Sequence, residues 1–157
     1  KLFAQAVADI LSETMPEQAE YFAKNVETFN SDLQAVYDDF AANTAGQTGN
    51  EFIVFHDAYD YLLESANIDN TLKQVFSENI FGDIGAAHTQ QLIDAIETYD
   101  IKNIYREPQL SDQALQNFAS KYNLSVGLLD PIGQDPLAAG YIKHIQNNLQ
   151  QLSKIYE

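Results

Sequence analysis

The chain has 157 residues, 45% of them hydrophobic and 20% charged, which fits one globular domain with a proper core. Eight Lys and Arg residues against 23 Asp and Glu residues give a net charge of −15, which argues against nucleic acid and anionic membranes as partners. The sequence has no cysteine, which excludes disulfides, cysteine-ligated zinc and thiol catalysis, so any metal must be held by His, Asp or Glu. No apolar run approaches the ~18 residues of a transmembrane helix.

Two helices are predicted before the first strand. Residues 1–13 carry apolar side chains at the spacing of one helix face, and no capping residue precedes Lys1, so we expect the true N-terminus to be absent. Thr14 and Glu17 have the spacing of a capping box and predict the start of a second helix. That helix is predicted to run to about residue 42, because an apolar stripe repeats at steps of three and four: Ala19, Phe22, Val26, Phe29, Leu33, Val36 and Phe40.

From residue 52 onwards, short apolar strands alternate with helices. The run 52–55 is apolar without alternation, as expected for a strand buried on both faces of a parallel sheet. We therefore predict an α/β fold, a roughly four-stranded parallel sheet with helices on both faces, preceded by the long amphipathic helix. The predicted strands are 52–55, 72–76, 101–105 and 124–129. Four helices are predicted in this part: one at about 58–67, one at about 86–99, one that begins at 111, and a final one that ends near 156. Loops are predicted at 43–50, at 77–85 and around Pro136.

Three potential metal ligands follow three of these strands. His56 comes directly after the first strand, Glu107 after the third and Asp130 after the fourth. Because the carboxyl ends of parallel strands share one edge, where α/β sheets bind their ligands, we expect these side chains to approach one crevice. An imidazole and carboxylates suit Zn²⁺, Mn²⁺ or Fe²⁺.

The residue pattern alone leaves simpler roles open for each of these side chains. A buried structural histidine at position 56 fits the same sequence, and so does a turn cap at Asp130. Glu107 equally suits a partner of Arg106 or of a backbone amide, and Asp57 suits the N-cap of the next helix.

Several motifs together resemble a known family. His56-Asp57-Ala58-Tyr59 is followed by Tyr61-Leu62, then by Glu107-Pro108-Gln109 and by Leu129-Asp130-Pro131-Ile132-Gly133. In this order and spacing they resemble the C-terminal lobe of the periplasmic metal-binding proteins that feed zinc and manganese ABC importers. The zinc-uptake, ZnuA-like branch is the most similar, and the resemblance covers essentially the whole chain. The loop 82–88 departs from the acidic-Pro-Ser sequence of many relatives.

The resemblance implies a metal site shared between two lobes, with the N-terminal lobe absent from this chain. Residues 1–13 are then the end of the inter-lobe helix, and 14–157 the C-terminal α/β lobe. His56 and Asp130 match metal-ligand positions, and Glu107 and Asp57 are expected to line the site or support a ligand. The other two histidines, His88 and His144, are read as ordinary surface or core residues.

The function implied by the resemblance is capture of Zn²⁺, with Mn²⁺ less expected, and its delivery to an ABC permease in the membrane. The protein is then periplasmic and not an enzyme. Two alternatives remain open on the residue pattern: a metal-assisted hydrolase using His56, Glu107 and Asp130, and an interaction domain without metal. The sequence lacks a nucleophile elbow, a phosphate-binding glycine loop and paired histidines at helical spacing. No pattern fixes the oligomeric state, although the apolar face of residues 1–13 suits pairing with a second copy.

Overall fold

Four parallel strands form a single sheet in the computed structural model, which describes residues 1–77, 84–133 and 138–157. Their order in the sheet is β2-β1-β3-β4. The strands are β1 (Phe52–Val54), β2 (Lys73–Val75), β3 (Asn103–Arg106) and β4 (Ser125–Leu128). The predicted parallel four-stranded sheet is therefore confirmed, with strand bounds that differ from the prediction by a residue or two.

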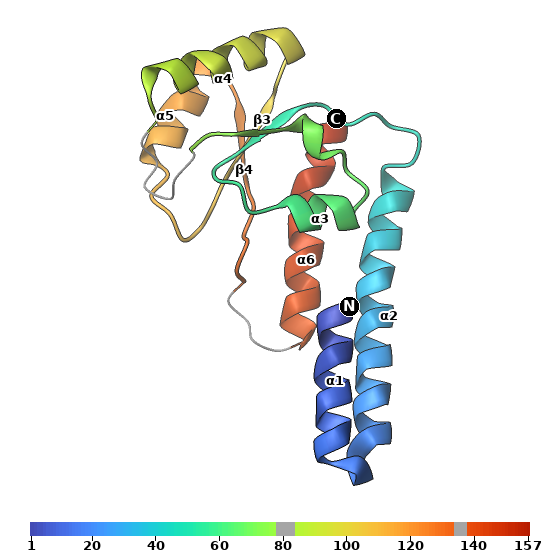
Figure 1. Ribbon diagram of the computed structural model, residues 1–157. Helices are drawn as coiled ribbons and strands as arrows, with labels where there is room; N and C mark the ends of the chain where they lie inside the picture. Colours follow the sequence, from blue (N-terminus) through green and yellow to red (C-terminus); the bar gives the residue numbers. More distant parts are fainter. Residues whose placement is uncertain (78–83, 134–137) are drawn as a thin grey trace.

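The described residues also form six α-helices (Figure 1). They are α1 (Leu2–Thr14), α2 (Ala19–Asn43), α3 (Asp60–Ser65), α4 (Ala86–Tyr99), α5 (Gln113–Tyr122) and α6 (Ala138–Leu152). Short 3₁₀ turns occur at η1 (Pro16–Gln18), η2 (Asn70–Leu72) and η3 (Ser153–Tyr156). In the described part of the chain, no helix combines the length and apolar character that crossing a membrane requires. Parts of the predicted loops at 77–85 and around Pro136 lie outside the described residues.

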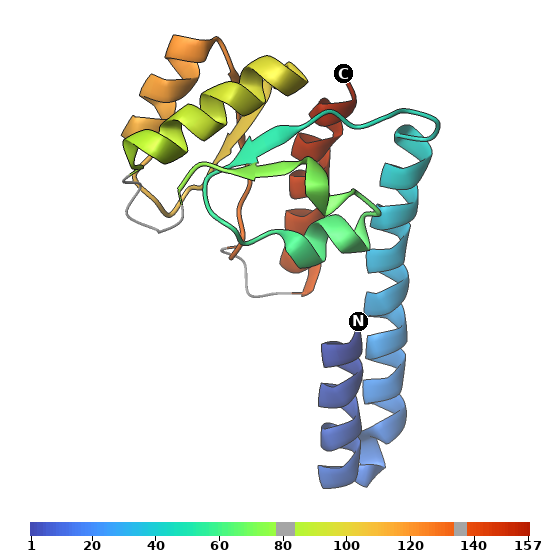
Figure 2. The same cartoon turned by 45° about the horizontal axis from the view of Figure 1, so that its top comes forward.

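The central strand β1 sends alternate side chains into two separate cores. Phe52 and Val54 join a cluster with side chains of α2, α3 and α6, whereas Ile53 and Phe55 join a cluster with α4 and α5. All four side chains are fully buried. This confirms the unbroken apolar run as a strand covered on both faces. Figure 2 shows α4 and α5 on one side of the sheet and α6 on the other.

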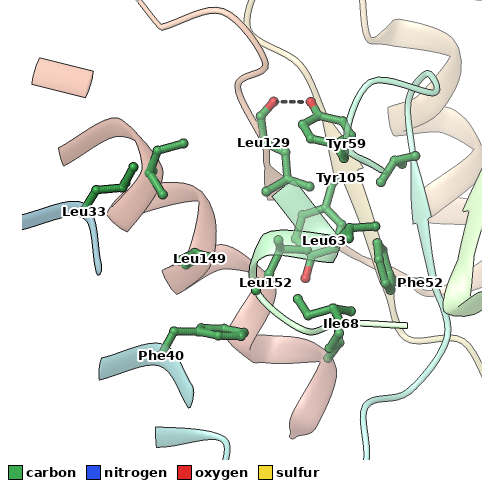
Figure 3. Close-up of a cluster of buried hydrophobic side chains, with 14 residues drawn as sticks. Leu33, Phe40, Phe52, Tyr59, Leu63, Ile68, Tyr105, Leu129, Leu149 and Leu152 are labelled. Carbon is green, nitrogen blue, oxygen red and sulfur yellow. Dashed lines mark hydrogen bonds between the residues drawn. The ribbon is translucent and has the colours of Figure 1, made fainter. Parts of the chain in front are cut away.

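The first of these cores lies beneath the candidate site. Leu33 and Phe40 of α2 pack toward Leu149 and Leu152 of α6, as the close-up in Figure 3 shows. In the same cluster the Tyr59 hydroxyl donates a hydrogen bond to the backbone carbonyl of Leu129 across 3.0 Å (Figure 3). This bond joins the segment after β1 to the segment after β4.

The long amphipathic helix is present, but the predicted capping box at its start is wrong. Thr14 is the last residue of α1, and its hydroxyl donates to the Ile10 carbonyl at 2.8 Å instead of capping α2. The chain leaves the helical conformation at Met15, because a proline at position 16 disfavours that conformation in the residue before it. The helices α1 and α2 then pack side by side as a hairpin that projects from the α/β body (Figures 1 and 2).

Glycine at position 127 lets β4 approach β3 and α6 closely. A Cβ added to Gly127 would lie 2.5 Å from the Tyr105 ring, a distance that real Cβ atoms do not adopt. The ring is held there because its hydroxyl donates to the Gln151 carbonyl of α6 at 2.9 Å. The position of β4, which leads into Asp130, therefore requires a residue without a side chain at position 127.

We expect Gly127→Ala to destabilise the fold by about 1–3 kcal/mol, because the tyrosine ring must leave its position to admit a methyl group. Gly85→Ala is the matched control, since an added Cβ there meets nothing within 4 Å. Urea unfolding of both variants provides the test. Equal stability of the two variants would show that Tyr105 adjusts without cost.

Candidate metal centre

His56 meets Glu107 at the carboxyl edge of the sheet. Val54 pairs with Tyr105 in the parallel register of β1 and β3, so residues two positions further along each strand come together. The His56 ring, with 27% of its side chain exposed, contacts the Glu107 carboxylate through Nδ1, and Glu107 has only 2% exposed. The His56 backbone N–H also donates to the same oxygen at 3.3 Å.

This contact determines which imidazole nitrogen of His56 is available to bind a metal ion. A carboxylate only accepts hydrogen bonds, so Nδ1 carries the proton and Nε2 keeps its lone pair. Burial raises the pKa of the Glu107 carboxyl, although its contacts with His56 and the Tyr59 hydroxyl act to lower it. Metal-binding imidazoles in proteins commonly have their second nitrogen held in this way.

Tyr59 contacts both the Glu107 side chain and the backbone directly before Asp130. Its side chain is buried, and its hydroxyl lies beside Glu107 while donating to the Leu129 carbonyl. Burial raises the pKa of the Tyr59 hydroxyl, and the nearby charges of Glu107 and Asp130 raise it further. Tyr59 therefore stays a neutral donor that holds the loop before Asp130 in place.

Asp130 has its carboxylate fixed by three donors on one oxygen. Oδ1 accepts from Gln109 Nε2 at 2.6 Å and from the backbone N–H groups of Ile132 and Gly133 at 3.0 and 3.1 Å. Burial alone would raise the pKa of the Asp130 carboxyl, but these bonds and nearby His144 hold it below its usual range. The group is thus an ionised carboxylate, suited to a cation.

Asp57 has its carboxylate paired with a lysine of β2. Its carboxylate pairs with Lys73, which also pairs with Asp60. The alternative role of Asp57 as an N-cap is wrong, because α3 begins at Asp60 with Tyr59 as its N-cap and no side-chain cap. The Lys73 side chain is nearly buried at the start of β2. A buried ammonium group is stable only when it is paired with opposite charge, and the Asp57 carboxylate supplies part of that charge.

The other two histidines differ from each other. His88 Nε2 lies 2.9 and 3.1 Å from the carbonyls of Val75 and Phe76, which is a structural role. His144 of α6 lies beside Asp130, with Nδ1 at 3.9 Å from Oδ2. Sequence reasoning passed over His144 because it belongs to no motif. The available signal was its spacing from Asn148, one helical turn further on.

The edge therefore holds two pairs, His56 with Glu107 and Asp130 with His144. In the ranges 1–77, 84–133 and 138–157, no three His, Asp or Glu side chains converge so as to hold a metal ion. A tight tetrahedral site needs about four ligands. By itself this edge offers part of such a set.

A family model described as ZnuA, zinc-uptake complex component A, periplasmic, matches residues 1–155. The chain belongs to this family. The predicted resemblance to the ZnuA family is thereby confirmed over nearly the whole sequence. The family is one of transport components, which disfavours the metal-assisted hydrolase that the sheet edge also suggested.

Individual ZnuA relatives extend well beyond this chain. The high-affinity zinc uptake system protein ZnuA of Haemophilus influenzae is 30% identical over 85% of the chain, which covers 39% of that protein. A crystal structure of ZnuA matches 98% of the chain with a TM-score of 0.79 and 21% identity, and the chain covers 55% of it. FpvC from Pseudomonas aeruginosa in complex with Mn²⁺ matches 97% with a TM-score of 0.79 and 20% identity, with 57% covered. The chain spans about half the length of these relatives, and the two structures support the fold alone.

The contacts of two histidines predict opposite tautomers. We expect neutral His56 to carry its proton on Nδ1, where Glu107 accepts it, and neutral His88 to carry it on Nε2, where two carbonyls accept it. Long-range ¹H–¹⁵N NMR of the metal-free chain, recorded where the imidazoles are neutral, distinguishes the two forms. An Nε2–H signal from His56 would contradict the assigned role of Glu107.

Proposed function

We propose that this chain is the C-terminal lobe of a zinc-capturing protein that delivers Zn²⁺ to an ABC permease. His56 binds the metal through Nε2, and Asp130 supplies a carboxylate oxygen. The observation that carries this proposal is the contact between His56 Nδ1 and buried Glu107, since it leaves Nε2 as the free nitrogen. No bond of a substrate is broken in this role, so no catalytic group is assigned.

Glu107 supports His56 without binding the metal. Its carboxylate is almost fully buried and already holds the ring and backbone N–H groups of His56. Asp57 is not assigned as a ligand in this proposal, because its carboxylate pairs with Lys73. Zn²⁺ suits an imidazole combined with a carboxylate, and Mn²⁺ suits sites richer in oxygen.

The remaining ligands belong to a second lobe. In this proposal residues 1–13 end the segment that joins the lobes, and 14–157 form the lobe described above. The outer face of the α1–α2 hairpin supports it, because Leu2, Phe3 and Ile10 are 90%, 83% and 62% exposed. Several exposed apolar side chains of this size on one short helix are typical of a surface that another part of a protein covers.

The cellular setting of the proposal follows the family. ZnuA-family components are described as periplasmic, which is where an importer collects its metal before the permease. A zinc-uptake relative is 30% identical to this chain, and a protein of the same fold has been solved with Mn²⁺. The net charge of −15 favours approach of a cation in a general way.

We expect the 157-residue chain to bind Zn²⁺ weakly, orders of magnitude below a complete two-lobe site, because it offers about half of the ligands. His56→Ala should abolish the binding heat in isothermal titration calorimetry. His88→Gln is the matched control, since glutamine retains a donor for the Val75 and Phe76 carbonyls and should leave zinc binding unchanged.

Two results would contradict the proposed function. Zinc binding that is unaffected by His56→Ala would return this histidine to a structural role. Nanomolar affinity of the monomeric chain would show that it holds a complete site and needs no second lobe.

A further inference from the structure

Two polar side chains of α6 lie next to Asp130. His144 and Asn148 are four residues apart, so they share a helix face, and both line a small cavity with Tyr59 and Asp130. Asn148 is only 4% exposed, and 17% of the His144 side chain is exposed. Polar groups at this depth require hydrogen-bond partners, and those of Asn148 fix its orientation.

The Asn148 side-chain amide forms two hydrogen bonds with the backbone of Asp130. The Asp130 N–H donates to Asn148 Oδ1 at 3.0 Å, and Asn148 Nδ2 donates to the Asp130 carbonyl at 2.7 Å. Because one bond needs an acceptor and the other a donor, the two ends of the amide are identified. Any flip of the amide would break both bonds.

The orientation of Asn148 in turn determines the tautomer of His144. Asn148 Nδ2 lies 3.4 Å from His144 Nε2, and an amide nitrogen only donates. His144 Nε2 must therefore present its lone pair, and the neutral ring carries its proton on Nδ1. That Nδ1 lies 3.9 Å from Asp130 Oδ2, which is too long for a hydrogen bond but within the range of an electrostatic contact.

The two oxygens of Asp130 thus have different tasks. Oδ1 takes the three donors from Gln109, Ile132 and Gly133, whereas Oδ2 faces His144. Three hydrogen bonds join the Asp130 backbone, the Asn148 amide and the His144 ring, and an electrostatic contact joins that ring to the Asp130 carboxylate. Three donors already hold Oδ1, and the electrostatic contact with His144 adds a preference for the side to which Oδ2 turns.

We propose that His144 is a positioning residue for Asp130, held in the Nδ1–H tautomer by Asn148 so that Oδ2 is presented to the metal. This inference rests on the proposed function, in which Asp130 is a ligand. His144 does not bind the metal, because Nδ1 carries a proton and Nε2 faces Asn148. Its effect on metal affinity passes through Asp130 alone.

The test is a double-mutant cycle on zinc affinity in the 157-residue chain, measured by competition with a chromophoric chelator. His144→Leu should weaken zinc binding about tenfold or more, the range found for residues that orient metal ligands. In an Asp130→Ala background the same substitution should change affinity by less than about twofold, because the group it positions is gone. His144→Asn should restore much of the loss, since its amide nitrogen can replace Nδ1–H.

Two further measurements keep the test independent of folding and of the proposed function. Thermal unfolding of the metal-free variants establishes that each is folded. Long-range ¹H–¹⁵N NMR of the unsubstituted chain without metal should show His144 as Nδ1–H, and Asn148→Leu should abolish this preference. An Nε2–H signal from His144 in the unsubstituted chain would overturn the inference.

The affinity outcomes separate this inference from the proposed function. An equal loss in both backgrounds would overturn it, because His144 would then act without Asp130. No loss with His144→Leu, while His56→Ala abolishes binding, would overturn the positioning role and leave the proposed function intact. Binding insensitive to His56→Ala would overturn both. A loss confined to the background that retains Asp130 would support it.

Discussion

A carboxylate buried at the end of β3 needs a partner, and this requirement organises the sheet edge. Glu107 has 2% of its side chain exposed, and its carboxylate accepts hydrogen bonds from the ring and from the backbone N–H of His56. An isolated buried carboxylate is strongly destabilising, so removing the imidazole affects the fold as well as the site. The same contact engages Nδ1 and leaves Nε2 as the ring nitrogen with an available lone pair. Stability and the proposed metal capture therefore depend on one interaction.

Much of this arrangement could be predicted from the sequence because it follows from strand geometry. The apolar run 52–55 is fully buried because the strand lies between two helical layers, and a polar residue directly after it must be at the carboxyl edge. The parallel register of β1 and β3 then brings His56 to Glu107 although 51 positions separate them. The helix α2 could likewise be predicted, because its apolar residues repeat with the period of a helix face.

Other features depend on contacts that a linear pattern does not encode. Asp57 follows His56 directly, yet its carboxylate turns to Lys73, a nearly buried cation that comes from another strand. His144 lies in no motif and reaches Asp130 only because α6 packs across the end of β4. Thr14 had the spacing of a helix cap, but Pro16 ended the preceding helix one residue later than that spacing implied. In each case a tertiary contact or a backbone restriction outweighed a local preference.

In the proposed function, one imidazole and one carboxylate of this chain bind the same metal ion. The most direct measurement is anomalous X-ray diffraction at the zinc edge from crystals of the zinc-loaded chain. We predict an anomalous peak about 2.0–2.1 Å from His56 Nε2 and about 2.0–2.2 Å from Asp130 Oδ2, with His56 Nδ1 still on Glu107. A zinc peak at His88 or on surface carboxylates, with His56 and Asp130 unoccupied, would contradict the claim.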